Sequence, residues 1–116
     1  EVQLVNNPTT NMVEGNGTIK VQTITDPHIG YPDKTLTIKA DSKVTLIGNS
    51  KGAICKVQVY NEDGSEYSGN KPLMSFSFEG NQTSTVEHSF ALKIPMDFEK
   101  PEDTYQGNMQ FQLELN

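Results

Sequence analysis

The residues that could do chemistry are few, and their spacing matches none of the common catalytic or metal-binding motifs. The chain holds two histidines, His28 and His88, and one cysteine, Cys55, and none has a second ligand at the spacing of a zinc site. No H-x-x-x-H, C-x-x-C or G-x-S-x-G occurs. His28 lies in the loop-like stretch DPHIGYP, where a metal ligand is an alternative, whereas His88 lies in an apolar stripe and is expected to pack. We expect no enzyme, no cofactor and no metal.

Two groups of carboxylates could hold a cation, but each has a simpler interpretation. In NEDGSE, side-chain oxygens alternate around Gly64 as in a calcium loop, yet the twelve-residue pattern and its final bidentate Glu are absent. Asp63-Gly64 is instead typical of a tight hairpin turn. A second group precedes the last strand pattern and is interpreted as a solvated face, with a patch for a cation or a basic partner as the alternative. Its members are Asp97, Glu99, Glu102 and Asp103.

Composition excludes two classes of partner. Nine basic and fifteen acidic residues give a formal net charge of −6, so the chain lacks the basic surface that neutralises nucleic-acid phosphates or anionic lipids. No apolar run approaches the roughly 20 residues that span a bilayer. Cys55 has no intrachain disulfide partner and alternates with Val57 and Val59. We therefore expect a buried thiol, with a reactive or intermolecular thiol as the alternative.

Alternating apolar residues, separated by Gly, Pro, Asn and Asp, predict strands throughout the chain. No stretch has the periodicity of a core helix. Strands without crossover helices pair antiparallel, so we predict an all-β, antiparallel two-sheet β-sandwich of about seven strands, forming a single domain over residues 18–116. The predicted strands are 17–24, 34–40, 43–48, 53–60, 73–79, 85–94 and 104–115.

The first seventeen residues, EVQLVNNPTTNMVEGNG, have a different character. VQLV can form a short strand, and NNPTTN is typical of an extended connector. Three interpretations stay open for residues 1–17: an edge strand that closes the sandwich, a flexible leader, or a segment that pairs with a neighbouring subunit.

The last predicted strand has the most regular alternation. From Tyr105 onward every second residue is apolar or Gly, ending with Phe111, Leu113 and Leu115. Burying this face would contribute several kcal/mol at roughly 25 cal/mol per Å². We therefore expect the strand to lie inside a sheet with its apolar face buried, so that replacing Phe111 with Asp unfolds the domain.

Two stretches resemble known families. Asp103, two residues before Tyr105, resembles the tyrosine corner of immunoglobulin-like sandwiches, in which the tyrosine hydroxyl bonds to upstream backbone. ALKIP, an acidic loop and T-Y-x-G resemble the C-terminal end of bacterial extracellular sandwich proteins such as chaperone–usher pilins. GTIKVQTITDPHIGY is similar to the N-terminal region of enterobacterial pilins. The resemblance implies an immunoglobulin-like fold.

The pilin resemblance also implies a function. It implies a non-enzymatic structural or adhesive module of a bacterial surface or fimbrial assembly, secreted or held at the cell surface, whose partner is a neighbouring subunit or a host protein. Such subunits lack one strand, and a neighbour's extension fills the apolar groove. The matching residues are Val2 and Leu4, or Ile19 and Val21, without an assignment of donor and acceptor.

A second hypothesis is a closed immunoglobulin-like domain that recognises protein or carbohydrate through its loops. The candidate loops are 25–34 and 61–72, with Tyr31, Tyr60 and Tyr67 as amphipathic contact residues. The alternative is that these tyrosines cap the core of the domain.

Overall fold

The computed structural model describes residues 2–22, 33–79, 85–95 and 100–116. Within these ranges the chain forms nine strands and no helix. The all-β prediction is confirmed, and two strands, β3 and β4, have the predicted bounds. The strands are β1 (Val5–Asn7), β2 (Met12–Gln22), β3 (Lys34–Ala40), β4 (Lys43–Gly48), β5 (Ile54–Tyr60), β6 (Met74–Phe78), β7 (Thr85–Pro95), β8 (Tyr105–Gln106) and β9 (Phe111–Leu115).

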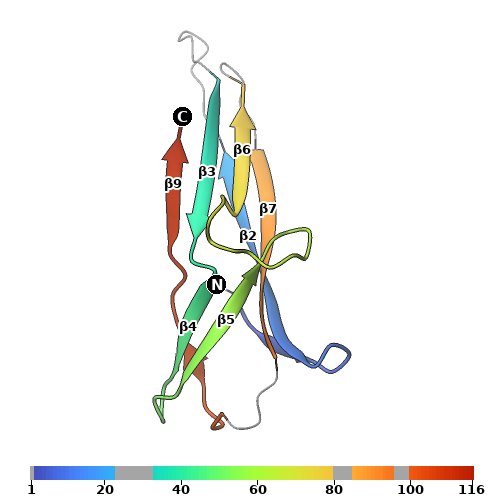
Figure 1. The fold of residues 1–116 in the computed structure, drawn as a ribbon, viewed down its shortest axis with the longest axis vertical. Coiled ribbons are helices and arrows are strands. Elements are labelled where there is room, and N and C mark those ends of the chain that lie inside the picture. Colours follow the sequence, from blue (N-terminus) through green and yellow to red (C-terminus); the bar gives the residue numbers. More distant parts are fainter. Residues whose placement is uncertain (1, 23–32, 80–84, 96–99) are drawn as a thin grey trace.

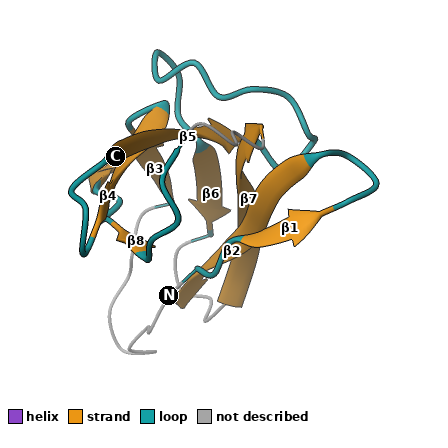
Figure 2. Ribbon diagram, turned by 90° about the horizontal axis from the view of Figure 1, so that it is seen from below, coloured by secondary structure: helices purple, strands orange, loops and turns teal. Residues whose placement is uncertain are grey.

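The strands form two antiparallel sheets. The larger has the order β1-β2-β7-β5-β4-β8, and the smaller has the order β6-β3-β9. Seen from below, the six-stranded sheet curls into a half-barrel, with β4 and β8 on one side and β2 and β1 on the other (Figure 2). The molecule is elongated, with extents of 60 × 28 × 23 Å and a Cα radius of gyration of 17.6 Å (Figure 1).

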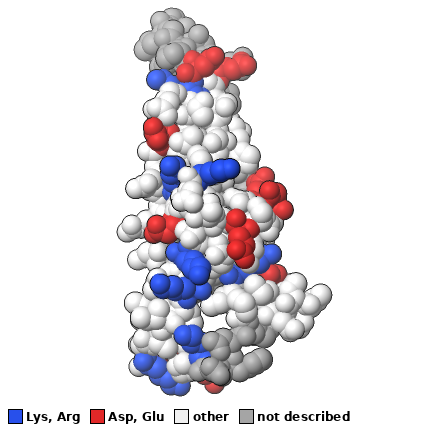
Figure 3. Space-filling model, in the orientation of Figure 1, with Lys and Arg blue, Asp and Glu red and all other residues white. Residues whose placement is uncertain are grey.

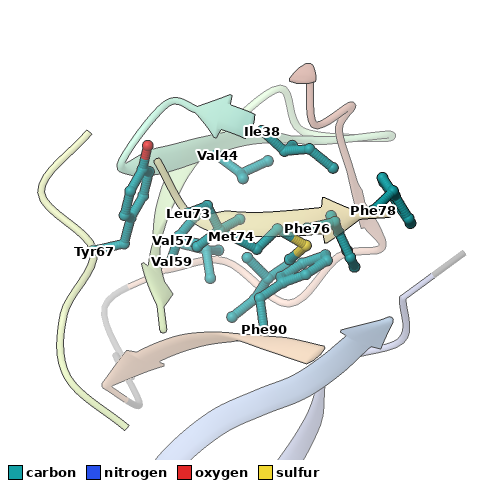
Figure 4. Packing of buried hydrophobic residues seen from close by; sticks show 11 residues of the cluster. Ile38, Val44, Val57, Val59, Tyr67, Leu73, Met74, Phe76, Phe78 and Phe90 are labelled. Carbon is teal, nitrogen blue, oxygen red and sulfur yellow. The ribbon is translucent and has the colours of Figure 1, made fainter. Parts of the chain in front are cut away.

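The core lies between the two sheets and contains buried residues from both of them. Phe76 and Ile38 of the small sheet and Val57 and Val59 of the large sheet are fully buried. Strand alternation places these four side chains on the facing sides of the two sheets. Tyr67 lies at one end of the cluster and Phe78 at the other (Figure 4).

The longest ladder joins β2 and β7 over eleven residue pairs, from Met12 opposite Pro95 to Gln22 opposite Thr85. Two glycines of β2 make room for other groups. A side chain at Gly17 would clash with the Phe90 ring, and one at Gly15 would clash with the Gln3 carbonyl. The GNG sequence therefore lies within a strand.

The last predicted strand is divided between the sheets. β8 pairs with β4 at the edge of the large sheet, whereas β9 pairs with β3 in the small sheet. Between them, Gly107 lies so close to the Thr45 carbonyl that a side chain would not fit. The chain thus crosses from one sheet to the other where a single strand was expected.

The surface is mixed in charge. On the face seen in Figure 3, lysines and carboxylates are interspersed over the strands. No helix in the described part of the chain could cross a membrane.

Candidate interaction edge

The most unusual surface of the molecule is the apolar face of β9. Leu115, Leu113 and Phe111 are the Cα partners of Leu36, Ile38 and Ala40 in the antiparallel ladder. Partners in such a ladder lie on the same face of the sheet. Since Ile38 is 1% exposed, this is the inner, core-facing side, yet Leu113 and Leu115 are 67% and 61% exposed. The expectation that the apolar face of the last strand is buried is therefore wrong for these two residues.

The exposure has a structural cause, because the large sheet covers only the start of β9. Phe111 packs edge-on against Phe90 of β7, with ring centroids 5.9 Å apart, and is itself 38% exposed. The large sheet ends on this side at β8, which is two residues long. Leu113 and Leu115, which follow Phe111 along the strand, are far more exposed than Phe111.

The outer edge of β9 carries backbone groups that pair with none of the described strands. Thr35 and Asn116 exchange backbone hydrogen bonds of 2.8 and 3.0 Å, so Asn116 points its N–H and C=O toward β3. Antiparallel ladders alternate, so the backbone groups of Phe111, Leu113 and Leu115 point away from β3. None of the described strands pairs with this side of β9. An apolar face and an unpaired edge therefore occur on the same five residues.

The segment before β9 is fixed by two side chains. The Tyr105 hydroxyl donates to the Pro101 carbonyl over 2.6 Å. The Asp103 carboxylate accepts from the backbone N–H groups of Lys51, at 2.8 Å, and Ser50, at 3.0 Å, which ties it to the turn between β4 and β5. The Lys51 N–H contributes most to lowering the pKa of Asp103 below its usual value.

The four candidate strand-exchange residues lie within the fold of their own chain. Ile19 and Val21 belong to β2, where they are the ladder partners of His88 and Val86 of β7. Val2 and Leu4 precede β1 and pack, partly buried, against the core cluster. None of the four is a free extension, and Leu113 and Leu115 were not among the candidate strand-exchange residues.

The three candidate contact tyrosines have different positions. Tyr67 is 3% exposed and donates its hydroxyl to the Lys71 carbonyl over 2.6 Å, so it corresponds to the alternative of a tyrosine that closes the core. Tyr60 is half-buried on the outer face of β5, with the Lys93 ammonium 5.1 Å from its ring centroid. Tyr31 lies outside the described residues.

Two carboxylates of the NEDGSE segment accept hydrogen bonds from the backbone of the chain. Asp63 accepts from the backbone N–H of Ser65 at 2.9 Å, and Gly64 has φ of +90°, as expected for a tight turn. Glu62 accepts from the Ser89 N–H at 2.6 Å, which is the main cause of its lowered pKa. No cluster of three or more metal-ligating side chains occurs among the described residues.

His88 and Cys55 are two further candidate residues that the structure describes. His88 packs against Phe76, with ring centroids 4.9 Å apart, and its Nδ1 lies 3.5 Å from a Glu62 carboxylate oxygen. Cys55 is a free, half-buried thiol. His28, Asp97 and Glu99 lie outside the described residues.

Sequence reasoning missed the exposure of β9 for a definable reason. Alternation is the same on both sides of Gly107-Asn108, so the pattern reads as one strand. The signal that could have indicated the break is that dipeptide, because Gly and Asn are unfavourable in strand interiors.

Comparisons with protein-family models, with curated proteins and with solved structures found no match to this chain. The geometry of the chain itself is therefore the basis for its functional interpretation.

Proposed function

We propose that this protein is a non-enzymatic structural or adhesive module of a bacterial surface or fimbrial assembly, with an immunoglobulin-like sandwich fold, that joins its neighbour by strand addition at β9. The observation that carries the proposal is the exposure of Leu113 and Leu115 on the core-facing side of an edge strand.

Strand addition explains both features of this edge together. An added strand takes its affinity from backbone hydrogen bonds and its specificity from alternate side chains that enter apolar pockets. Natural edge strands are usually protected by charge, Pro or a bulge. β9 has the sequence FQLEL, in which Glu114 is the only charged residue, and it points to the outer face.

The proposal is tested with extended peptides as probes. Fluorescein-labelled peptides of residues 2–7 and 17–22, which contain the candidate strand-exchange residues, are titrated against the chain by anisotropy. Serine replacements of their apolar residues serve as controls. We expect saturable binding of at least one alternating peptide, and no binding of the controls.

A proline in β9 separates edge pairing from loss of the fold. The Leu113 N–H points away from β3, so Leu113→Pro removes no ladder bond but blocks the edge. Gln112→Pro is the contrasting variant, because the Gln112 N–H points toward β3 and its loss destabilises the sheet. Peptide binding that survives Leu113→Pro would exclude β9 as the docking edge. A chain that binds neither peptide and does not self-associate would overturn the proposal.

A closed domain that binds protein or carbohydrate is a second candidate, supported by one observation. A shallow groove on the large sheet is lined by Tyr60, Asn61, Glu62, Glu14 and Lys93. An aromatic ring beside amides, carboxylates and an ammonium group suits polar ligands. Loss of glycan or protein binding in a folded Tyr60→Ala variant, with no effect of Leu113→Pro, would favour this candidate.

A further inference from the structure

We infer that the neighbour is a second copy of this chain, and that the two β9 strands pair antiparallel about a twofold axis at Leu113. The inference rests on the proposed function, since it specifies the occupant of the same edge. A twofold interface uses one surface on both copies, so the surface must be complementary to itself. Three properties of β9 satisfy that condition.

The first property is the direction of the backbone groups. In an antiparallel pair, residues whose N–H and C=O point at the partner must oppose one another. These residues in β9 are Phe111, Leu113 and Leu115, given that Asn116 bonds to Thr35 on the other side. An axis at Leu113 sets Leu113 opposite itself and Phe111 opposite Leu115 of the second copy. A shift by one residue would break this match.

The second property is the chemistry of the inner face. With the axis at Leu113, the central row across four strands contains Ile38 and Leu113 of one copy and the same two residues of the second copy. The flanking rows contain Leu36 and Leu115 beside the second copy's Phe111 and Ala40. Every member of these rows is apolar, so the exposed leucines cover one another.

The third property is the charge pattern of the outer face. An axis at Leu113 sets Gln112 opposite Glu114 of the second copy, so an amide donor meets a carboxylate twice. Lys39, the β3 partner of Gln112, lies in the same row and supplies a positive charge. An axis at Glu114 would set two carboxylates opposite each other, which destabilises a strand pair.

The net charge predicts how the dimer depends on salt. Each copy carries −6, so long-range repulsion opposes pairing, whereas the contacts at β9 are mainly apolar. Salt screens the repulsion and leaves apolar contact intact. We therefore expect the dimer dissociation constant to fall as salt rises from about 0.01 M to about 0.15 M.

Self-association is measured by sedimentation equilibrium over a wide range of protein concentration. We expect a monomer–dimer equilibrium that Leu113→Glu weakens at least tenfold, because two carboxylates would then meet at the axis. Ile54→Glu is the matched control, since Ile54 is similarly exposed at 53% but lies on β5. Circular dichroism checks that both variants fold. A monomer at every concentration, or equal effects of the two variants, would overturn the inference.

Cysteine cross-linking tests the register independently of affinity. In a Cys55→Ala background, Leu113→Cys should form an intermolecular disulfide, because opposed Cα atoms lie about 5.5 Å apart, within reach of a disulfide. Leu115→Cys should not cross-link, because the two copies of residue 115 are offset by four residues, about 14 Å. Cross-linking of Gln112→Cys instead of Leu113→Cys would contradict the axis at Leu113.

The outcomes separate the inference from the proposed function. Peptide binding that requires the β9 edge, in a chain that stays monomeric, rejects the second copy and keeps strand addition. Absence of both peptide binding and self-association rejects both.

Discussion

Strands β6 and β9 flank the same central strand, β3, and have the same alternating pattern, yet they differ in burial. Met74, Phe76 and Phe78 of β6 are 7%, 1% and 8% exposed, whereas Phe111, Leu113 and Leu115 of β9 are 38%, 67% and 61% exposed. Both strands pair with β3 over five residues. The two strands therefore have equal pairing within their own sheet and differ in how the large sheet packs on them.

The difference lies in what covers each strand. His88 of β7 packs on Phe76, and Phe90 of β7 packs on Phe111, after which the cover of β9 ends. The two strands therefore pair with β3 over the same length, while only β6 has its apolar face buried. A strand can be held by its ladder and by an anchored preceding segment even when its own apolar side chains are exposed.

The largest expected effect concerns the covered strand. Phe76→Ala should reduce the free energy of unfolding by about 3–5 kcal/mol, since it removes a fully buried ring and leaves a cavity. The measurement is urea denaturation followed by circular dichroism. Leu113→Ala is the matched control on β9 and should cost less than about 0.5 kcal/mol in the monomer. Similar losses at both positions would mean that the exposure of Leu113 does not hold in solution.

An intermediate effect is expected where the cover of β9 ends. Phe111→Asp was expected from the sequence to unfold the domain. Since the ring is 38% exposed and packs edge-on against Phe90, we expect a loss of about 2 kcal/mol with the fold retained. Thermal unfolding of the variant measures this directly. A variant with no cooperative transition would show that β9 is as important to the core as β6.

The smallest expected effect concerns the anchor that precedes β9. The pKa of Asp103 is lowered from 3.8 by backbone N–H groups of the turn between β4 and β5. A lowered folded-state pKa stabilises the fold above the unfolded-state pKa, and this contribution is lost as the pH falls through the folded-state value. Wild-type stability should thus decline below about pH 4, and Asp103→Asn should decline less steeply over the same window.

Urea midpoints at several pH values measure this slope. Asp63→Asn is the control, because Asp63 also has a lowered pKa but serves the turn after β5, far in sequence from β9. Hydrogen exchange at Gln112 and Glu114 should increase in Asp103→Asn and remain unchanged in Asp63→Asn. Equal exchange in both variants would show that the anchor does not hold β9.

Much of the fold was predictable because alternation and turn chemistry are local properties. β3 and β4 have the predicted bounds, and β5, β6 and β7 differ from prediction by single residues at their ends. β2 begins at Met12 rather than at residue 17, and so contains both Gly15 and Gly17. Gly15 makes room for the Gln3 carbonyl, and Gly17 makes room for the Phe90 ring. These neighbours come from other parts of the chain, so no local pattern could reveal the role of the two glycines.

The exposed edge of β9 was beyond sequence reasoning for a similar reason. The pattern from Tyr105 to Leu115 correctly predicted strands and an apolar face. It could not show that the chain changes sheets at Gly107, because that depends on the position of the Thr45 carbonyl. Burial of Leu113 depends on a cover that another part of the molecule must supply, and the sequence of β9 contains no information about it.

The elongated shape has a practical consequence for the elution of this protein in gel filtration. A compact chain of this length would have a radius of gyration of about 13 Å, whereas this one has 17.6 Å. Its frictional drag therefore exceeds that of a sphere of equal mass, and a monomer should leave a gel-filtration column early, at the volume of a heavier globular standard. From its elution volume alone, a monomer could be assigned as a dimer. The oligomeric state must therefore be determined from the molar mass, by light scattering or sedimentation equilibrium.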